Sequence, residues 1–179
     1  MACLPLDFPA LCVFGNHRLD ETYIRVKGAW KYLYRTVDKT GQTIDFLLTE
    51  QRDEQAAKRF LTKAIRRHGV PKKITIDGSE ANAAAIRSYN KEHGTTIAIR
   101  QVKYLNNIIE QDHRGVKRVT RPMLGCKAFD AAMLGFKAFD AAQSTLVGIE
   151  LMHMLRKSQM VGGAEQSLTA AEQFYVLAA

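Results

Sequence analysis

A change in hydrophobic period near residue 50 most constrains how this 179-residue chain can fold. Before that point, β-branched and aromatic residues dominate three short segments, which the turn signals Lys27-Gly28 and Asp38–Gly41 separate. The segments are Thr22–Val26, Trp30–Val37 and Thr43–Thr49. Consecutive strands joined by tight turns predict an antiparallel meander.

Beyond residue 50, helical and strand patterns alternate. Asp53 is a predicted N-cap, and Gly69 with Pro71 is expected to end the helix that it starts. The later predicted elements are a strand over Lys73–Ile76, a helix from Ser79 to Gly94, a strand over Thr95–Val102, and a basic helix after Asn106-Asn107. The order β-β-β-α-β-α-β-α predicts an α/β fold, with a mixed sheet and helices against its faces.

The charge of the chain favours a polyanionic partner such as nucleic acid. The formal net charge is +8 and the pI is about 9.5, and seven basic residues face only two acids between Arg100 and Lys127. A solvated charged face is the alternative interpretation of such a stretch. Over the whole chain, 46% of the residues are hydrophobic and 25% are charged, which is typical of a single globular domain.

The cysteines and the hydropathy pattern limit the cellular compartments in which the protein is expected. Three cysteines without C-x-x-C spacing support neither a disulfide framework nor a zinc site. No apolar run is long enough to span a membrane, and the first residues lack the features of a secretory signal. We therefore expect a cytoplasmic protein with no membrane partner.

Three acidic residues are the candidate site. Asp20 opens the first β segment, Asp77 follows the strand Lys73–Ile76, and Glu110 lies near the start of the basic helix. Two strand carboxylates and one helix carboxylate can converge at one edge of an α/β sheet, where they could hold hard divalent cations, which prefer oxygen ligands. This arrangement predicts a metal-dependent phosphoryl-transfer site that acts on DNA.

Four neighbouring side chains receive weaker predictions. Glu21 and Asp112 are expected either to support the acids or to lie on the surface. His113 could orient a ligand, although a surface or capping role is equally compatible with its position. His153, inside an apolar stripe, is predicted to be a packing residue.

A ten-residue tandem repeat follows the basic helix. Residues 123–132 read MLGCKAFDAA and residues 133–142 read MLGFKAFDAA, so the copies differ at one position. One short copy is too little for a solenoid. On a helix, ten residues turn about 1000°, roughly 80° short of three turns, which would misalign the apolar faces on either side. A helical pattern over Leu146–Leu155 follows, and Gly162-Gly163 is expected to break it.

Several stretches resemble the catalytic domain of bacterial insertion-sequence transposases of the DDE class, with the insertion-sequence-six family as the closest subgroup. The stretches are Asp20–Gly28, Trp30–Arg35, Ile74–Asp77 with Ala81-Asn82, Arg100–Asn107, Glu110–Arg118, Arg121–Gly125 and Gly148–Met152. They occur in the same order as in the family. The likeness runs from about Asp20 to Gln159.

The resemblance implies a ribonuclease-H-like fold and a catalytic triad of Asp20, Asp77 and Glu110. These residues would hold two Mg²⁺ or Mn²⁺ ions. It also implies that Lys117, seven residues after Glu110, contacts DNA at the transposon end. The partners would be DNA, both transposon ends and target, and further copies of the same chain on that DNA.

Spacing along the basic helix agrees with a DNA-contacting role. Glu110, Arg114, Lys117 and Arg121 follow i, i+4, i+7, i+11 spacing, so they share one helical face. The predicted DNA-binding residues are Lys103, Arg114, Lys117, Arg118 and Arg121. Cations beside a carboxylate suit a surface that meets both metal ions and phosphate groups.

The domain organisation follows from these limits. Residues 20–160 are the predicted catalytic domain, which includes the repeat at 123–142. Residues 1–19 are predicted to be a loosely ordered leader, and residues 161–179 a tail. Members of the family usually carry a helix-turn-helix region before the catalytic domain. Residues 1–19 do not resemble that region, so we expect an N-terminally truncated relative.

Two functions from different classes follow. The first is a DNA transposase domain that cleaves phosphodiester bonds and transfers strands. The alternative is a catalytically impaired remnant that only binds DNA or oligomerises. A generic ribonuclease-H-like nuclease is a third, weaker hypothesis.

Overall fold

The computed structural model describes residues 15–102, 107–123, 137–159 and 168–178, with the backbone alone at 121–123 and 176–178. Its elements are β1 (Asn16–Val26), β2 (Ala29–Val37), β3 (Thr43–Thr49), α1 (Glu54–His68), β4 (Lys73–Ile76), α2 (Glu80–His93), β5 (Ala98–Gln101), α3 (Asn107–Met123), α4 (Phe139–Arg156) and α5 (Ala170–Ala178). None of the helices in these described ranges is long and apolar enough to cross a membrane.

The described strands form one mixed sheet in the order β3-β2-β1-β4-β5. The first three make the predicted antiparallel meander, and β4 and β5 add to β1 in parallel. A two-residue turn joins β1 to β2, with φ of 51° at Lys27 and 76° at Gly28. Left-handed residues at both positions are typical of the tight hairpin turns that match strand twist. The predicted mixed sheet is confirmed.

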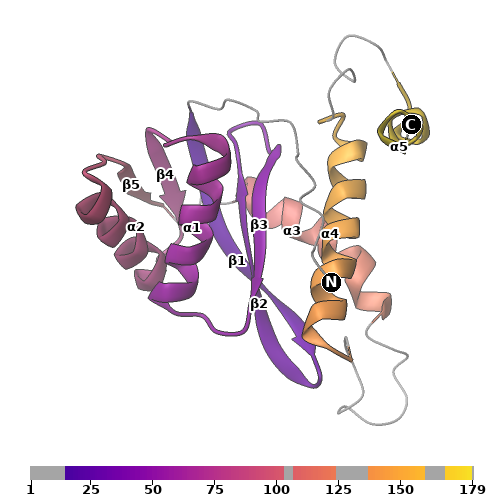
Figure 1. Ribbon diagram of the computed structural model, residues 1–179, viewed down its shortest axis with the longest axis horizontal. Helices are drawn as coiled ribbons and strands as arrows, with labels where there is room; N and C mark the ends of the chain where they lie inside the picture. Colours follow the sequence, from indigo (N-terminus) through magenta and orange to yellow (C-terminus); the bar gives the residue numbers. More distant parts are fainter. Residues whose placement is uncertain (1–14, 103–106, 124–136, 160–167, 179) are drawn as a thin grey trace.

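Helices cover both faces of the sheet (Figure 1). On one face, α1 and α2 bury an apolar cluster with Leu19 of β1 and Ile74 and Ile76 of β4. On the other, α3 and α4 pack on Ile24 and Leu33 of the hairpin. Side chains of a strand alternate between faces, so β1 contributes to both layers.

The N-terminal boundary of the domain differs from the sequence prediction. Strand β1 begins at Asn16, so assigning residues 16–19 to a loose leader is wrong, and Leu19 is only 2% exposed. Residues 16–18 pair with 73–75 of β4, a long-range parallel contact that the local pattern does not display. Residues 1–14 lie outside the described ranges.

Strand β5 is shorter than the predicted Thr95–Val102. It covers only Ala98–Gln101, because the Asn90 side chain holds the preceding residues in a loop. Asn90 Oδ1 accepts hydrogen bonds from Thr95 Oγ1 at 2.7 Å and from the Ile97 backbone N–H at 3.1 Å. The end of α2 therefore decides where the strand can start.

The C-terminal region contains more helix than the sequence pattern predicts. Helix α4 spans Phe139–Arg156 and extends the predicted Leu146–Leu155 at its N-terminal end, while α5 lies in the predicted tail and packs against α4. The last four residues of the repeat form the first turn of α4. Most of the repeat and Gly162-Gly163 fall outside the described residues, as does the expected misalignment of apolar faces.

A fully buried arginine on β2 fastens α3 and α4 to the sheet. Arg35 Nη2 donates to Glu150 Oε2 of α4 at 2.8 Å, and Arg35 Nε lies 2.7 Å from Glu150 Oε1. The same guanidinium lies 2.5 Å from Asp112 Oδ2 of α3. One cation on the sheet thus meets a carboxylate from each helix of that layer.

Asp112 gathers two more partners from the end of α4. His153 Nε2 lies 2.7 Å from Asp112 Oδ1, and Lys157 forms an ion pair with the same oxygen. Burial alone would raise the pKa of Asp112, but the His153 hydrogen bond and the charges of Arg35 and Lys157 outweigh burial and hold it well below its usual range. Gly115 allows this approach, because a Cβ there would lie 2.6 Å from His153 Cε1.

Removing this arginine should destabilise the protein severely. Arg35→Met leaves the buried Glu150 carboxylate without its cation, and breaking a buried pair in this way costs about 3–5 kcal/mol. Urea unfolding at pH 7 measures the change. Arg35→Met/Glu150→Leu should recover part of the loss, because Asp112 retains His153 and Lys157. If Arg35→Met were as stable as the parent, the ion pairs of Arg35 would not have the stabilising role given to them.

Candidate active site

Two of the predicted acids lie close together, one in strand β1 and one just after the neighbouring strand β4. The parallel register pairs Arg18 with Thr75, and the same register extended by two residues puts Asp20 beside Asp77. Asp20 is in the interior of β1 rather than at its start, while Asp77 directly follows β4. Asp20 also lies opposite Arg35 in the antiparallel pair with β2. The central strand therefore links the acids to the buried ionic cluster.

Backbone amides hold both carboxylates in place. Asp20 Oδ1 accepts from the Glu21 backbone N–H at 2.9 Å, and Asp77 Oδ1 accepts from the Ser79 backbone N–H at 2.9 Å. Ser79 occupies the predicted N-cap position of α2, but its side chain makes no capping hydrogen bond. Asp77 thus shapes the turn into α2.

The third acid comes from the first turn of α3. Glu110 is exposed there, two residues before the Asp112 carboxylate that pairs with Arg35. One residue further, the buried His113 places Nδ1 at 3.8 Å from Asp20 Oδ2. The turn that carries Glu110 is therefore held against β1 and β2 through Asp112 and His113.

The electrostatics show that the other two acids act on Asp20. Burial raises the pKa of Asp20 to about 7, and the nearby charges of Glu21, Asp77 and Glu110 push it in the same direction. Burial, with the charges of Arg35 and Lys117, lowers the pKa of His113 to about 3. His113 is therefore neutral near pH 7 and does not compensate the negative charge of Asp20.

The donor set is suited to a hard cation, although its side chains are not arranged as ligands. Within the described ranges, no group of three or more His, Cys, Asp or Glu side chains is placed to hold a metal ion. Carboxylate oxygens are nevertheless the ligands that Mg²⁺ and Mn²⁺ prefer. A divalent cation would offset the burial and the like-charge repulsion that together raise the pKa of Asp20. The chemistry of the cluster therefore fits the metal, and the triad stays a prediction.

Glu21 and Asp112 are buried supports, so the surface alternative for both is wrong. Glu21 is 8% exposed; it pairs with Arg52 and accepts a hydrogen bond from Asn82 Nδ2 at 2.8 Å. This contact ties α2 and the segment before α1 to β1, next to Asp20. His153 is hydrogen bonded to Asp112, which confirms that it is a satisfied structural residue.

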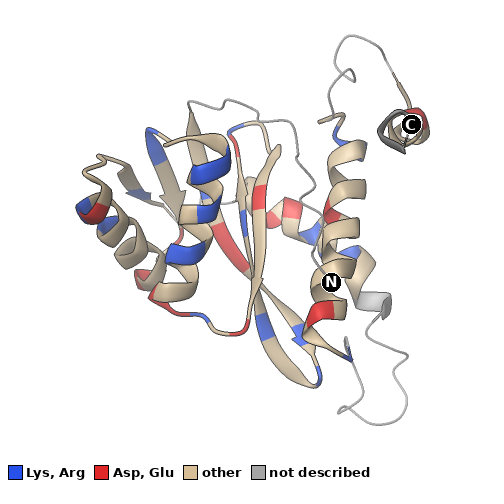
Figure 2. Ribbon diagram, in the orientation of Figure 1, with Lys and Arg blue, Asp and Glu red and all other residues tan. Residues whose placement is uncertain are grey.

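The structure describes the side chains of three of the five predicted DNA-binding residues. On α3, Arg114 and Arg118 are exposed and Lys117 is half-buried. Arg121 lies in the same helix, but its side chain is outside the description, and Lys103 falls in an undescribed segment. Figure 2 shows basic residues on α3 and on α1, which cover opposite faces of the sheet.

The hairpin adds an aromatic surface, although the alternation of Trp30, Tyr32 and Tyr34 along a strand predicts core or cross-strand packing for these residues. A hollow between β1, β2 and α3 includes Tyr23, Trp30 and Tyr32 in its lining, with Lys117 beside them. Trp30 is 56% exposed, and the Arg25 guanidinium lies 5.5 Å from the centre of its ring. Alternating aromatic residues on paired strands were the available signal for this surface.

Sequence reasoning also missed the buried Arg35–Glu150 pair, which lies next to the site because Arg35 is opposite Asp20 in the sheet. The signal was present, because each is a charged residue inside an apolar run, Leu33–Val37 and Ile149–Leu151. A charge within such a run is rarely buried unless it is paired.

Comparison with known proteins places the chain in a family. Residues 15–159 match the family described as a DDE domain, of the type found in the IS240 transposase. The chain is 42% identical over 112 residues to the transposase for insertion sequence-like element IS431mec of Staphylococcus aureus strain N315, covering 58% of this chain and 47% of that protein. The transposase for insertion sequence element IS257 in transposon Tn4003 of S. aureus matches to the same extent. The chain thus spans about half the length of these transposases.

The fold resembles retroviral integrase cores. The HTLV-2 integrase catalytic core domain in complex with magnesium superposes in its dimeric form with a TM-score of 0.56 and 14% identity, over 89% of this chain and 94% of that one. The trimeric form gives 0.55 and 13%, over 82% and 86%. These neighbours confirm the ribonuclease-H-like fold. With the family match over most of the chain, the protein belongs to the DDE-domain transposases of bacterial insertion sequences, in the insertion-sequence-six family.

Proposed function

We propose that this domain cleaves DNA phosphodiester bonds and transfers strands in transposition, with divalent metal ions held by Asp20, Asp77 and Glu110. One observation carries the proposal: β1 and β4 pair in parallel up to Arg18 and Thr75, two residues before Asp20 and Asp77, and burial together with the charges of Asp77 and Glu110 raises the pKa of Asp20. The family match supports the reaction class. The magnesium named with the integrase neighbours agrees with the choice of Mg²⁺ or Mn²⁺, and two ions are part of the proposal.

The residues of the chain divide the work. When bound, the metal would activate the attacking oxygen and stabilise charge on the leaving one. The carboxylates of Asp20 and Asp77 hold their side of the site rigidly, because backbone amides fix both. The pair of Arg35 with Asp112 positions the turn that carries Glu110. Neutral His113 fills the space between α3 and Asp20 without adding a competing cation.

DNA would approach along α3. The exposed Arg114 and Arg118 and the half-buried Lys117 offer cations to phosphate groups next to the acids. We further propose that the substrates are the transposon end and the target, and that several copies act together on the DNA. Lys103 and Arg121 complete the proposed DNA-binding set.

Replacement of Glu110 should abolish catalysis. Glu110→Gln keeps size and helix propensity but removes one negative charge from the metal site, so Mg²⁺-dependent nicking of supercoiled plasmid is expected to fall at least a hundredfold, a typical scale for loss of one preorganised electrostatic group. Glu54→Gln is the matched control, since Glu54 is an exposed acid in the first turn of α1. The control should cut as the parent does.

The pattern of products separates the alternatives. Products joined to target DNA indicate a transposase, whereas nicks without joining indicate a general nuclease. Salt-dependent DNA binding without cleavage by the parent chain indicates a remnant that only binds DNA. Equal cutting by Glu110→Gln and parent would rule out the proposed triad.

The stability of the metal-free protein should depend on Asp20. Its pKa is raised to about 7 from an ordinary 3.8, so the folded state binds an extra proton between about pH 4 and pH 7. The free energy of unfolding must then fall as pH rises through this window. Asp20→Asn lacks this titration and keeps an oxygen for the Glu21 amide. At pH 8 in EDTA it should be more stable than the parent by on the order of 2 kcal/mol.

Urea unfolding at pH 5 and pH 8 checks this expectation. The parent should lose stability between the two values, and the variant should lose less. Mg²⁺ at pH 8 should then stabilise the parent and leave Asp20→Asn nearly unchanged, because ligand binding to the folded state raises its apparent stability. The same pH dependence of stability in the parent and in Asp20→Asn would mean that the pKa of Asp20 is not raised.

A further inference from the structure

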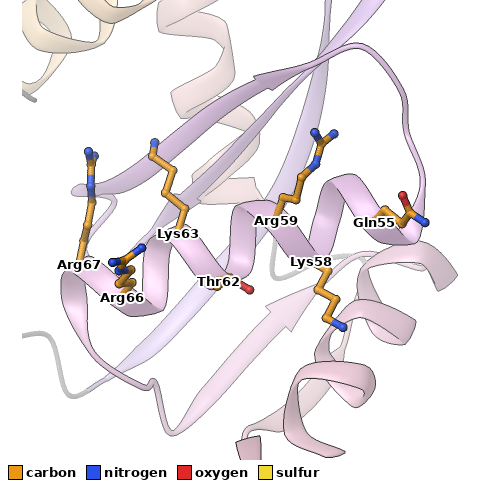
Figure 3. Close-up of a pocket in the computed structure, with 7 residues that line it drawn as sticks. All are labelled: Gln55, Lys58, Arg59, Thr62, Lys63, Arg66 and Arg67. Carbon is orange, nitrogen blue, oxygen red and sulfur yellow. The ribbon is translucent and has the colours of Figure 1, made fainter. Parts of the chain in front are cut away.

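The outer face of α1 carries a row of cations that the proposed active site does not use. Five basic residues lie there, and we call them the α1 basic face: Lys58, Arg59, Lys63, Arg66 and Arg67. All five line a hollow along this helix, and Figure 3 shows their side chains arising from α1 alone. In that view, Arg59, Lys63 and Arg67 point in the same direction, away from α2.

The row follows from the helical period. Two lines of residues repeat every four positions, one through Lys58 and Arg66 and one through Arg59, Lys63 and Arg67, while the opposite face is buried in the core. From Lys58 to Arg67 the row covers about 14 Å at 1.5 Å per residue. That length is comparable to the width of a DNA groove, about 12 Å for the major groove.

Most of this charge is not compensated. Glu92 pairs with Lys58, and Asp45 lies 2.8 Å from Lys63 and 3.8 Å from Arg67. In the part of the chain that the structure describes, Arg59 and Arg66 are exposed and have no carboxylate partner. Five cations against two carboxylates leave a local excess of three positive charges.

The stability of the fold does not explain the two cations of the row that have no carboxylate partner among the described residues, Arg59 and Arg66. Like charges four residues apart destabilise a helix, and Arg59, Lys63 and Arg67 are spaced in this way. Bound phosphate groups would remove that repulsion, and cations in a row along a helix suit a polymeric anion better than a small one.

The row of cations on α1 begins near the proposed acids. Arg52, just before α1, pairs with Glu21, which neighbours Asp20. The N-terminal end of α1 therefore starts near Asp20 and Asp77, the end of the sheet that we call the acidic edge. The basic face runs from there along the side of the sheet opposite α3 (Figure 1). Cations therefore flank the acidic edge on both faces of the molecule.

We propose that the α1 basic face is a second DNA-binding surface, which contacts the phosphate backbone of duplex DNA separately from the cations of α3. The inference rests on the proposed function only in taking DNA as the polyanion, and it requires neither metal nor cleavage. Because the contacts are to phosphates, this surface adds affinity without reading sequence.

A matched pair of double variants tests the proposal in EDTA, with a 30-base-pair duplex and the full chain. Arg59→Gln/Arg66→Gln removes two charges from the face, and Lys72→Gln/Lys91→Gln removes two exposed charges elsewhere. The slope of log Kobs against log salt should become shallower by about 1.8 in the first variant, since each phosphate contact contributes about 0.9. The control should change it by less than half as much.

Two further measurements locate the effect. The thermal midpoint of Arg59→Gln/Arg66→Gln should equal or exceed that of the parent, which shows that lost binding is not misfolding. In the parent, DNA should protect Lys58 and Lys63 from acetylation, read by mass spectrometry, and leave Lys72 and Lys91 reactive.

Equal slopes for the two double variants, or unprotected Lys58 and Lys63, would overturn the proposal. A duplex RNA of the same length that binds this face more tightly than DNA would overturn the choice of ligand. If the parent does not cleave DNA but DNA still protects Lys58 and Lys63, the proposed function would be wrong and the proposed DNA-binding surface would be supported.

Discussion

The buried guanidinium of Arg35 is the interaction on which the layer behind the acidic edge depends. Its charge is removed from water, a change that is costly unless every neighbouring group is a matched partner. Glu150 and Asp112 supply those partners from two helices, and His153 and Lys157 complete the shell around Asp112. Such a cluster tolerates few arrangements, so it fixes how α3 and α4 sit on the sheet.

This constraint reaches the acids because the same elements carry them. Arg35 lies opposite Asp20 in the sheet, and Asp112 is two residues from Glu110 in α3. The ionic cluster is neutralised within the core, whereas burial and the nearby charges of Glu21, Asp77 and Glu110 together raise the pKa of Asp20. The charges around Arg35 are thus balanced by their partners, whereas those of Asp20, Asp77 and Glu110 are not. Only the three acids would therefore attract a cation.

Local sequence signals predicted much of the fold because short-range forces set those elements. The strands Thr43–Thr49 and Lys73–Ile76 match their predicted bounds, and the Asp53 side chain accepts a hydrogen bond from the Ala56 amide as an N-cap should. Errors occur where a distant partner decides: β4 pairing extends β1 back to Asn16, and Asn90 delays β5. The same holds for the site, where burial of Glu21 and Asp112 depends on cations elsewhere in the chain.

The sequence by itself determined the element order as far as α4 and the family, and it named Asp20, Asp77 and Glu110 as a candidate triad at strand or helix positions that can meet at one sheet edge. Only the tertiary structure decided that Arg35 would find Glu150, 115 residues away, and that the cations of α1 and α3 would face opposite sides. The physical reason is range. Helix and strand periods and caps act over a few residues, whereas burial and ion pairing depend on which distant segments share the interior.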